Sequence, residues 1–343
     1  MSRDLFTSFP GYTGWVPDEA DDRDFNFTAT YRPPWGIGQY LRSEANTTAK
    51  KNGFETEKYW NAIYDQGQTG SCTANAVAAA YSFALNRSRK AEGGSDAASY
   101  PSRSFIYYNA RKGNQEDPED DEQELVPDDG SQIRLAMRSL QRFGVCEDES
   151  WPLKAASVNW YPGPYAYFEA QRGMIRSYQY KRLDVKRWNS DRSAIIEKKD
   201  TATMDKDGDV VLYNLRSSIS QGHPVVFGFR IYLDPDVGRF QFNQAEEGSS
   251  LSAFTRWYLP SVPQDRRHLG PPTQNGGHAV VAVGFVDGKK KARSGWVLCQ
   301  NSWGENKEVP GAPFFWLPYD YITDFVATAD FWMMDVSGFP SKL

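Results

Sequence analysis

Cys72 is the residue whose surroundings most clearly indicate chemistry. It follows a glycine-rich stretch, residues 65–71, and begins a segment with the composition of a helix. The amides and the dipole at a helix start carry about half a positive charge. That field stabilises a thiolate, which is the nucleophilic form of cysteine. The pattern therefore predicts a nucleophile at a helix N-terminus, against the alternative of an ordinary buried thiol.

A nucleophilic cysteine needs a base, and the chain contains three histidines. His278 follows two glycines and opens an apolar run typical of a strand, so it can be aimed across a cleft. His223 lies in a turn before a strand, which favours a structural role. His268 lies in a polar loop, where we expect it to be solvated. We infer that His278 is the base.

Asn301 ends the next predicted strand along the chain, residues 295–301. An antiparallel pairing of the two strands can place its side-chain carbonyl beside the His278 ring. An uncharged orienting group suits a thiolate–imidazolium pair, which already contains its own anion. Trp303 can cover the hydrogen bond between Asn301 and His278 and keep water away from it.

The elements that must position these residues change character along the chain. We predict helices at 71–90, 101–111, 131–143 (ended by Gly144) and 212–221 (ended by Gly222). We predict strands at 224–232, 278–286, 295–301, 314–317 and 329–335. Helices early and strands late indicate an α+β protein with a cleft between its halves. Two charged stretches interrupt this pattern: a solvated acidic loop at 115–124, and an inserted loop or exposed helix at 187–209.

These motifs resemble the signature blocks of the papain-like (C1) cysteine peptidases. The matching blocks, in the family's order, are Gln66-Gly67, Gly70-Ser71-Cys72, Gly277-His278-Ala279 and Asn301-Ser302-Trp303-Gly304. The residues after Cys72 and the motif Trp15-Val16-Pro17-Asp18 resemble the bacterial and viral branch. The resemblance covers most of the chain beyond residue 60.

The resemblance implies a two-lobed fold and amide hydrolysis through a thioester on Cys72. We expect an N-terminal extended arm at 1–58 with a regulatory role, a helical lobe at 59–180 and a β-barrel-like lobe at 181–343. The family places the oxyanion between the Cys72 backbone N–H and the Gln66 side chain. Gly130 and Trp303 are predicted to bind substrate, which is a peptide or a protein. No cofactor and no metal are expected.

The sequence also departs from the family pattern. Thr69 stands where the family usually has a cysteine, so that disulfide is absent, and Cys146 and Cys299 are expected to be ordinary buried thiols. Residues 1–60 do not resemble the family's long helical propeptide. One hypothesis is that the aromatic N-terminal arm occupies the cleft and restrains activity instead.

Two other functions stay open at this point. A thiol acyltransferase, such as a peptide ligase or cyclase, would use the same acyl-enzyme and exclude water. A catalytically silent peptide-binding homologue would use the same scaffold, although it has no need of the full set of four residues.

Composition excludes some partners. The net charge is −5, with a pI near 5.4, which does not resemble the basic footprint of a nucleic-acid binder. No apolar run approaches the roughly 18–20 residues that span a bilayer, and the start of the chain lacks the apolar core of a secretory signal. Three cysteines do not make a disulfide framework. We therefore expect a cytoplasmic protein.

Overall fold

The computed structural model describes most of the chain. The described residues are 14–18, 21, 23–40, 63–91, 100–113, 125–172, 178–184, 201–231, 242–247, 249, 251–252, 255–261, 277–288, 294–324 and 327–336. The predicted acidic loop at 115–124, the charged residues 187–200 and His268 lie outside them.

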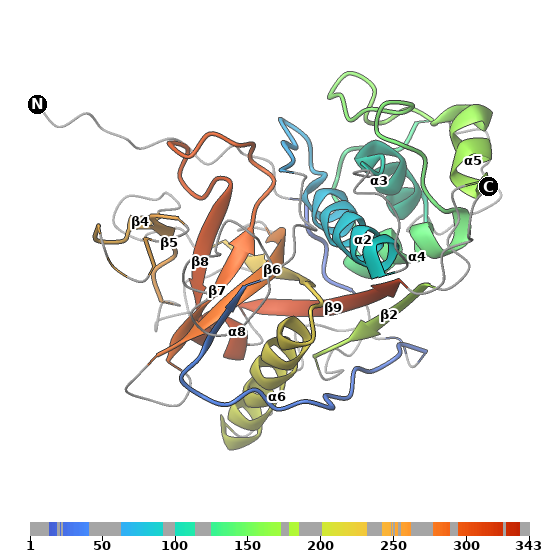
Figure 1. The fold of residues 1–343 in the computed structure, drawn as a ribbon. Coiled ribbons are helices and arrows are strands. Elements are labelled where there is room, and N and C mark those ends of the chain that lie inside the picture. Colours follow the sequence, from blue (N-terminus) through green and yellow to red (C-terminus); the bar gives the residue numbers. More distant parts are fainter. Residues whose placement is uncertain are drawn as a thin grey trace, which may run out of the picture.

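Four helices gather on one side of the molecule (Figure 1). They are α2 (Cys72–Ala91), α3 (Arg103–Lys112), α4 (Ile133–Phe143) and α5 (Gly163–Arg172). The first three are the helices predicted at 71–90, 101–111 and 131–143. Gly144 ends α4 as predicted, with a φ of 70° and its N–H on the Leu140 carbonyl. The sequence analysis missed α5, which buries little more than Ala166 and Ala170 and so has a weak helical pattern.

The other side of the molecule is one sheet. Its strands are β1 (Gly38–Tyr40), β2 (Tyr178–Arg182), β3 (Val225–Arg230), β4 (Asn243–Gln244), β5 (Trp257–Tyr258), β6 (Gly277–Asp287), β7 (Gly295–Gln300), β8 (Phe314–Pro318) and β9 (Thr328–Val336). The order is β2-β9-β3-β6-β7-β8-β5-β4, with β1 also on β6, and only β5 and β8 pair in parallel. All five predicted strands are confirmed. Among the described residues the pairings form an open path, so closure into a barrel stays a prediction.

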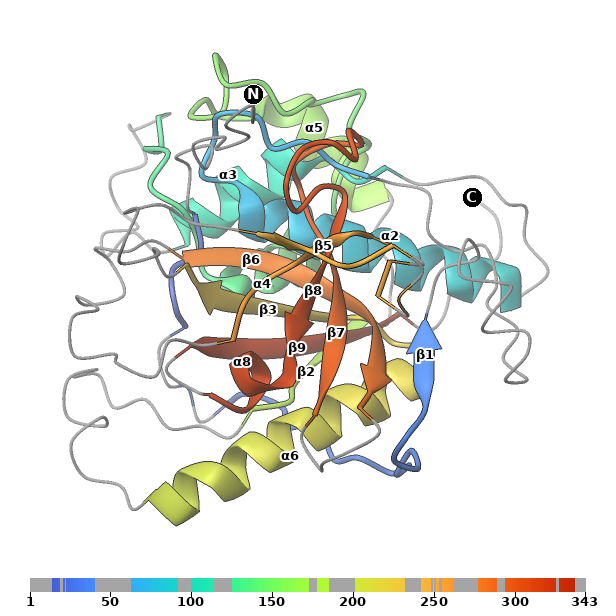
Figure 2. The same ribbon diagram turned by 90° about the vertical axis from the view of Figure 1, so that its left-hand side faces the viewer.

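Two further helices belong to the β-rich side. Helix α6 (Thr201–Ser220) lies on the far side of the strands from α2, and α8 (Tyr319–Thr323) is a short helix after β8 (Figure 2). The predicted helix at 212–221 is the second half of α6. Residues 201–209, which the sequence left as loop or exposed helix, are helical. No helix among the described residues is long and apolar enough to cross a membrane.

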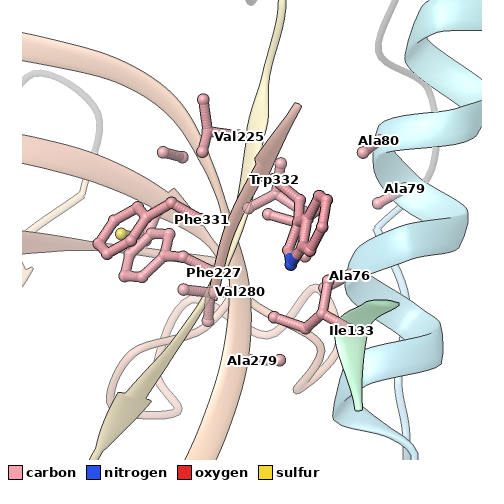
Figure 3. Packing of buried hydrophobic residues seen from close by; sticks show 14 of the residues in the cluster. Ala76, Ala79, Ala80, Ile133, Val225, Phe227, Ala279, Val280, Phe331 and Trp332 are labelled. Atoms are coloured by element: carbon pink, nitrogen blue, oxygen red, sulfur yellow. The ribbon is translucent and has the colours of Figure 1, made fainter. Parts of the chain in front are cut away.

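Helix α2 packs between the other helices and the sheet. Ala76, Ala79 and Ala80 face the sheet, where the Trp332 ring fills the space in front of them (Figure 3). Small side chains let the helix approach the sheet closely. Behind Trp332, the rings of Phe227 and Phe331 stack with centroids 4.9 Å apart. This packing fixes the N-terminus of α2 relative to the strands.

Candidate active site

Cys72 is the first residue of α2, and its side chain is 0% exposed. The glycine-rich loop before it is held from the helical side. The Gly70 N–H donates to Asp128 Oδ1 at 2.9 Å, and the Tyr107 hydroxyl donates to the same oxygen at 2.5 Å. On the helix, the Asn75 side chain donates to the Ser71 carbonyl at 2.8 Å. These bonds set the position of the thiol.

His278 and Asn301 meet because β6 and β7 are antiparallel neighbours. His278 Nε2 lies 2.8 Å from Asn301 Oδ1. The orientation of the amide is fixed independently, since Asn301 Nδ2 donates to the Gly311 carbonyl at 3.0 Å and Oδ1 accepts the Ser302 N–H at 2.8 Å. An oxygen that faces Nε2 requires the proton there. In the neutral ring, Nδ1 is therefore the nitrogen that can accept a proton from a thiol.

Two aromatic rings hold the imidazole. Trp303 stacks on His278 with centroids 5.0 Å apart and an interplanar angle of 29°. Phe229, paired with His278 across β3 and β6, meets the imidazole edge to face, with ring centroids 5.7 Å apart. Trp303 thus lies on the His278 ring, and its predicted cover of the Asn301 hydrogen bond stays a prediction. Its contact with substrate stays a prediction.

The predicted nucleophile lies against the strand that carries the predicted base. The backbone N–H of Ala279, the residue after His278, donates to the Cys72 sulfur. The helical and β-rich sides therefore touch at the point where the sequence places the chemistry.

Gln66 is joined to the Asn301 side of the site. Its backbone N–H donates to the Ser302 carbonyl at 2.9 Å, and its Oε1 accepts the Ser302 hydroxyl at 2.6 Å. One proton of its Nε2 goes to the Thr69 carbonyl at 2.8 Å. Gln66 is thus buried between the two sides, and its oxyanion role stays a prediction.

One further histidine and two further cysteines were predicted to have structural roles. His223 lies outside the site, with Nε2 3.4 Å from the Arg87 guanidinium, and burial lowers its pKa to about 4. Cys146 and Cys299 are buried free thiols, as predicted.

Residues 14–18, from here on the 14–18 segment, lie directly over Cys72. The Gly14 backbone N–H donates to the Cys72 sulfur. On one side, Ser131 N–H donates to the Gly14 carbonyl at 2.8 Å, and Val16 N–H donates to the Ser131 carbonyl at 3.0 Å. On the other, Trp15 N–H donates to the Gly277 carbonyl at 3.2 Å. The segment therefore bridges the helical side and the β-rich side beside the nucleophile.

The fit of the 14–18 segment depends on glycine. A Cβ on Gly14 would overlap the Gly70 carbonyl, and a Cβ on Gly130 would lie 2.5 Å from the Gly14 carbonyl oxygen. Gly130, with a φ of 88°, was predicted to lie beside a substrate backbone; here it lies beside the chain's own backbone. The sequence analysis placed an arm over the body but did not identify Gly14 as the point of contact.

Buried charges anchor the same segment. Asp18 Oδ1 accepts the Arg134 N–H at the start of α4, and Oδ2 accepts the Trp332 Nε1–H at 2.8 Å. Further along, Asp24 accepts two bonds from the Arg134 guanidinium. Burial raises the pKa of Asp18, while the positive charges of Arg182 and Arg134 oppose that shift. An acidic side chain at a helix N-terminus is a favourable placement.

Comparison with known proteins agrees with this geometry. Xylellain, a cysteine protease from Xylella fastidiosa, superposes with a TM-score of 0.59 at 26% identity, over 97% of this chain and 98% of that one. An uncharacterized peptidase C1-like protein of Acanthamoeba polyphaga mimivirus is 29% identical over 270 residues, which are 79% of this chain and 68% of the relative. The chain is a cysteine peptidase that resembles the papain-like family.

More distant structures share the fold alone. A digestive procathepsin L2 of the Tenebrio molitor larval midgut superposes with a TM-score of 0.54 at 14% identity, over 96% of this chain and 79% of that one. No protein-family model matches the sequence. The bacterial and viral relatives agree with the branch that the motifs after Cys72 resemble.

The peptidase holds its two reactive groups without charge in this structure. Burial raises the pKa of the Cys72 thiol to about 11, although the N–H groups of Ala279 and Gly14 lower it in part. Burial likewise lowers the pKa of His278 to about 4, although the hydrogen bond that its ring donates to Asn301 raises the pKa in part. The sequence analysis predicted a thiolate. Exclusion of water by the surrounding chain, including the 14–18 segment, outweighs the field of the helix.

This protonation state predicts how the peptidase reacts with iodoacetamide. Alkylation needs the thiolate, so in the full chain the rate at Cys72 should keep rising about tenfold per pH unit between pH 7 and 9.5, without levelling. In a Trp15→Ala variant, which loosens the 14–18 segment, the rate should level at a lower pH. Peptide mass mapping identifies the labelled thiol, and Cys72→Ala supplies the blank. Identical profiles would contradict burial by the segment as the cause.

Proposed function

We propose that Cys72, His278, Asn301 and Gln66 carry the hydrolysis of peptide bonds. The Cys72 thiol passes its proton to His278 Nδ1, and the sulfur attacks the carbonyl carbon of the scissile bond. His278 then protonates the leaving amine, and a thioester forms on Cys72. In the second half, His278 takes a proton from water, which hydrolyses the thioester and frees the thiol.

Asn301 keeps the imidazole in the tautomer that this sequence of steps needs. Its oxygen accepts the Nε2–H and its amide donates to the Gly311 carbonyl, so Nδ1 is the ring nitrogen that can take the thiol proton. As the first residue of α2, Cys72 has a backbone N–H that no carbonyl within the helix can accept. We assign it to the oxyanion, together with Gln66 Nε2.

The observation that carries the proposal is the bond from Ala279 N–H to the Cys72 sulfur, since Ala279 directly follows His278, whose ring Asn301 fixes. Its test combines labelling and cleavage in the Trp15→Ala background. Iodoacetamide should label Cys72 and stop cleavage of a casein substrate. Cys72→Ala should lose both, whereas Cys146→Ala, which removes another buried thiol, should keep both. Cleavage that survives in Cys72→Ala would refute the assignment.

An acyl-enzyme can also pass its acyl group to an amine. Cleavage in the presence of an added amine, with the hydrolysed and aminolysed products separated by mass, distinguishes a hydrolase from an acyltransferase. Hydrolysed product should dominate.

We also propose that the arm has a regulatory role. Cys72 and His278 are both 0% exposed, so no peptide can reach the sulfur while the 14–18 segment is in place. The backbone bonds of the segment to Ser131 and Gly277 are the kind that an extended peptide makes. The segment therefore holds the enzyme inactive until it leaves.

A cytoplasmic location is proposed from the thiols. All three cysteines are free, which suits a reducing compartment. Fractionation of cells that express the full chain would test it.

A further inference from the structure

The indole of Trp15 fills a site next to the nucleophile. We define the indole site as Gly228 on β3, Gly277 on β6 and Asp330 on β9. A Cβ on Gly228 would overlap the indole ring, and a Cβ on Gly277 would lie 2.5 Å from its Cε3. The ring is only 7% exposed. The two glycines therefore supply the room that a flat, large side chain needs.

The indole site belongs to the path of a substrate. Gly228 pairs with Ala279, whose N–H reaches the Cys72 sulfur. The residue before Trp15 places its own N–H on the same sulfur. A peptide that reaches Cys72 passes the same place and directs a side chain toward Gly228.

The far end of the indole site is polar. Trp15 Nε1–H donates to Asp330 Oδ2 at 3.1 Å, and the Asp18 backbone N–H donates to the same oxygen at 2.8 Å. Asp330 is fully buried, and its Oδ1 accepts from the Arg182 guanidinium at 2.9 Å. When the arm leaves, Oδ2 loses both donors that the arm provides. A substrate side chain that fills the site without a donor would bury this oxygen unpaired, which is costly, so a ligand that restores the bond is favoured.

The charge around Asp330 selects among the possible donors. Arg182 forms an ion pair with Asp330. The same guanidinium also bonds Asp184 and contacts Asp24, so the Asp330 carboxylate already has a cationic partner. A second cation from a lysine or arginine side chain would meet Arg182 in a buried place. A phenyl ring would fill the room between the glycines and leave Oδ2 without a donor. A neutral ring with an N–H satisfies both conditions.

We propose that the indole site selects peptide substrates with a tryptophan side chain, with Gly228 providing the room and Asp330 accepting the indole N–H. This inference rests on the proposed peptidase activity of Cys72. The 14–18 segment then shows the enzyme with its own tryptophan in the place of the substrate's.

The test uses the full chain with Trp15→Ala, which vacates the indole site. Internally quenched peptides carry tryptophan, 3-benzothienylalanine, phenylalanine or glycine at one of the three positions on either side of the scissile bond. Benzothienylalanine has the shape of tryptophan, with sulfur in place of the N–H. At one position, kcat/KM for tryptophan should exceed that for benzothienylalanine about tenfold, and that for glycine about 100-fold.

A second variant connects the preference with the site. Gly228→Ala in the same background should remove most of the preference for tryptophan over glycine. Gly113→Ala is the matched control, because a Cβ there lies 3.5 Å from its nearest neighbour, and it should keep the preference. Equal rates for tryptophan and benzothienylalanine would overturn the role of Asp330. Cleavage without any preference would overturn the inference alone, whereas no cleavage of any peptide would refute the proposed function itself.

Discussion

Replacing Trp15 with alanine is expected to raise the peptidase activity of the full chain by about 10²–10³-fold. Truncation of a buried tryptophan costs about 3–5 kcal/mol, and each 1.4 kcal/mol changes an equilibrium tenfold. Here the cost falls on the docked arm, because the indole packs on Gly228 and bonds Asp330 only while the 14–18 segment is in place. The population with an open Cys72 should rise by the same factor, up to the point where most molecules are open.

The measurement is the rate of casein cleavage by the purified full chain. Phe25→Ala is the control, because Phe25 is an aromatic side chain on the same arm that is 71% exposed and should leave the rate unchanged. Circular dichroism should show that both variants keep the fold. The Trp15→Ala enzyme could instead cleave casein no faster than the wild type, and its Cys72 could be alkylated as slowly. That result would show that the segment does not restrain the enzyme.

The candidate catalytic residues could be located from sequence because each lies in a clear local pattern. A glycine-rich loop before a helix marks Cys72, and strands with clear apolar runs mark His278 and Asn301. Their meeting follows from two features that the sequence also shows, the alanine-rich face of α2 and the order of β6 and β7. The open sheet path and the oxyanion role of Gln66 do not follow from these patterns.

The position of the 14–18 segment could not be predicted, because it depends on pairs of residues far apart in the chain. Gly14 fits only because neither it nor Gly130 has a side chain, and Trp15 fits only because Gly228 has none. Each glycine alone reads as a turn or a weak strand position. The local signal is the motif Trp15-Val16-Pro17-Asp18, which resembles the bacterial and viral branch but does not show where the segment docks.

The protonation state of Cys72 could not be predicted for a related reason. The helix start favours a thiolate, and the sequence shows that start plainly. The opposing effect is burial, which comes from the arm and from the contact of two sides of the molecule. The electrostatic effect of a helix N-terminus can be predicted from a sequence motif. The desolvation of Cys72 cannot, because it depends on the whole fold.

Replacing His278 with alanine in the Trp15→Ala background is expected to lower kcat by about 10⁵-fold. Removal of the base from a nucleophile–base pair costs on the order of 10⁶ in a serine enzyme, and a thiol is the better nucleophile without help. The loss should shrink as the pH rises, because hydroxide then deprotonates Cys72 in place of the imidazole. Asn301→Ala should lose less, since the imidazole is still present and Trp303 still stacks on it.

His223→Ala is the matched control, since it removes a histidine that lies outside the site beside Arg87. It should keep full activity in the same background. The decisive comparison is the pH dependence of kcat: loss of folding would lower the rate equally at every pH, whereas loss of a proton acceptor lowers it most at neutral pH. A His278→Ala enzyme within tenfold of its parent at pH 7 would mean that another group takes the Cys72 proton, and the geometry offers the imidazole fixed by Asn301 for that task.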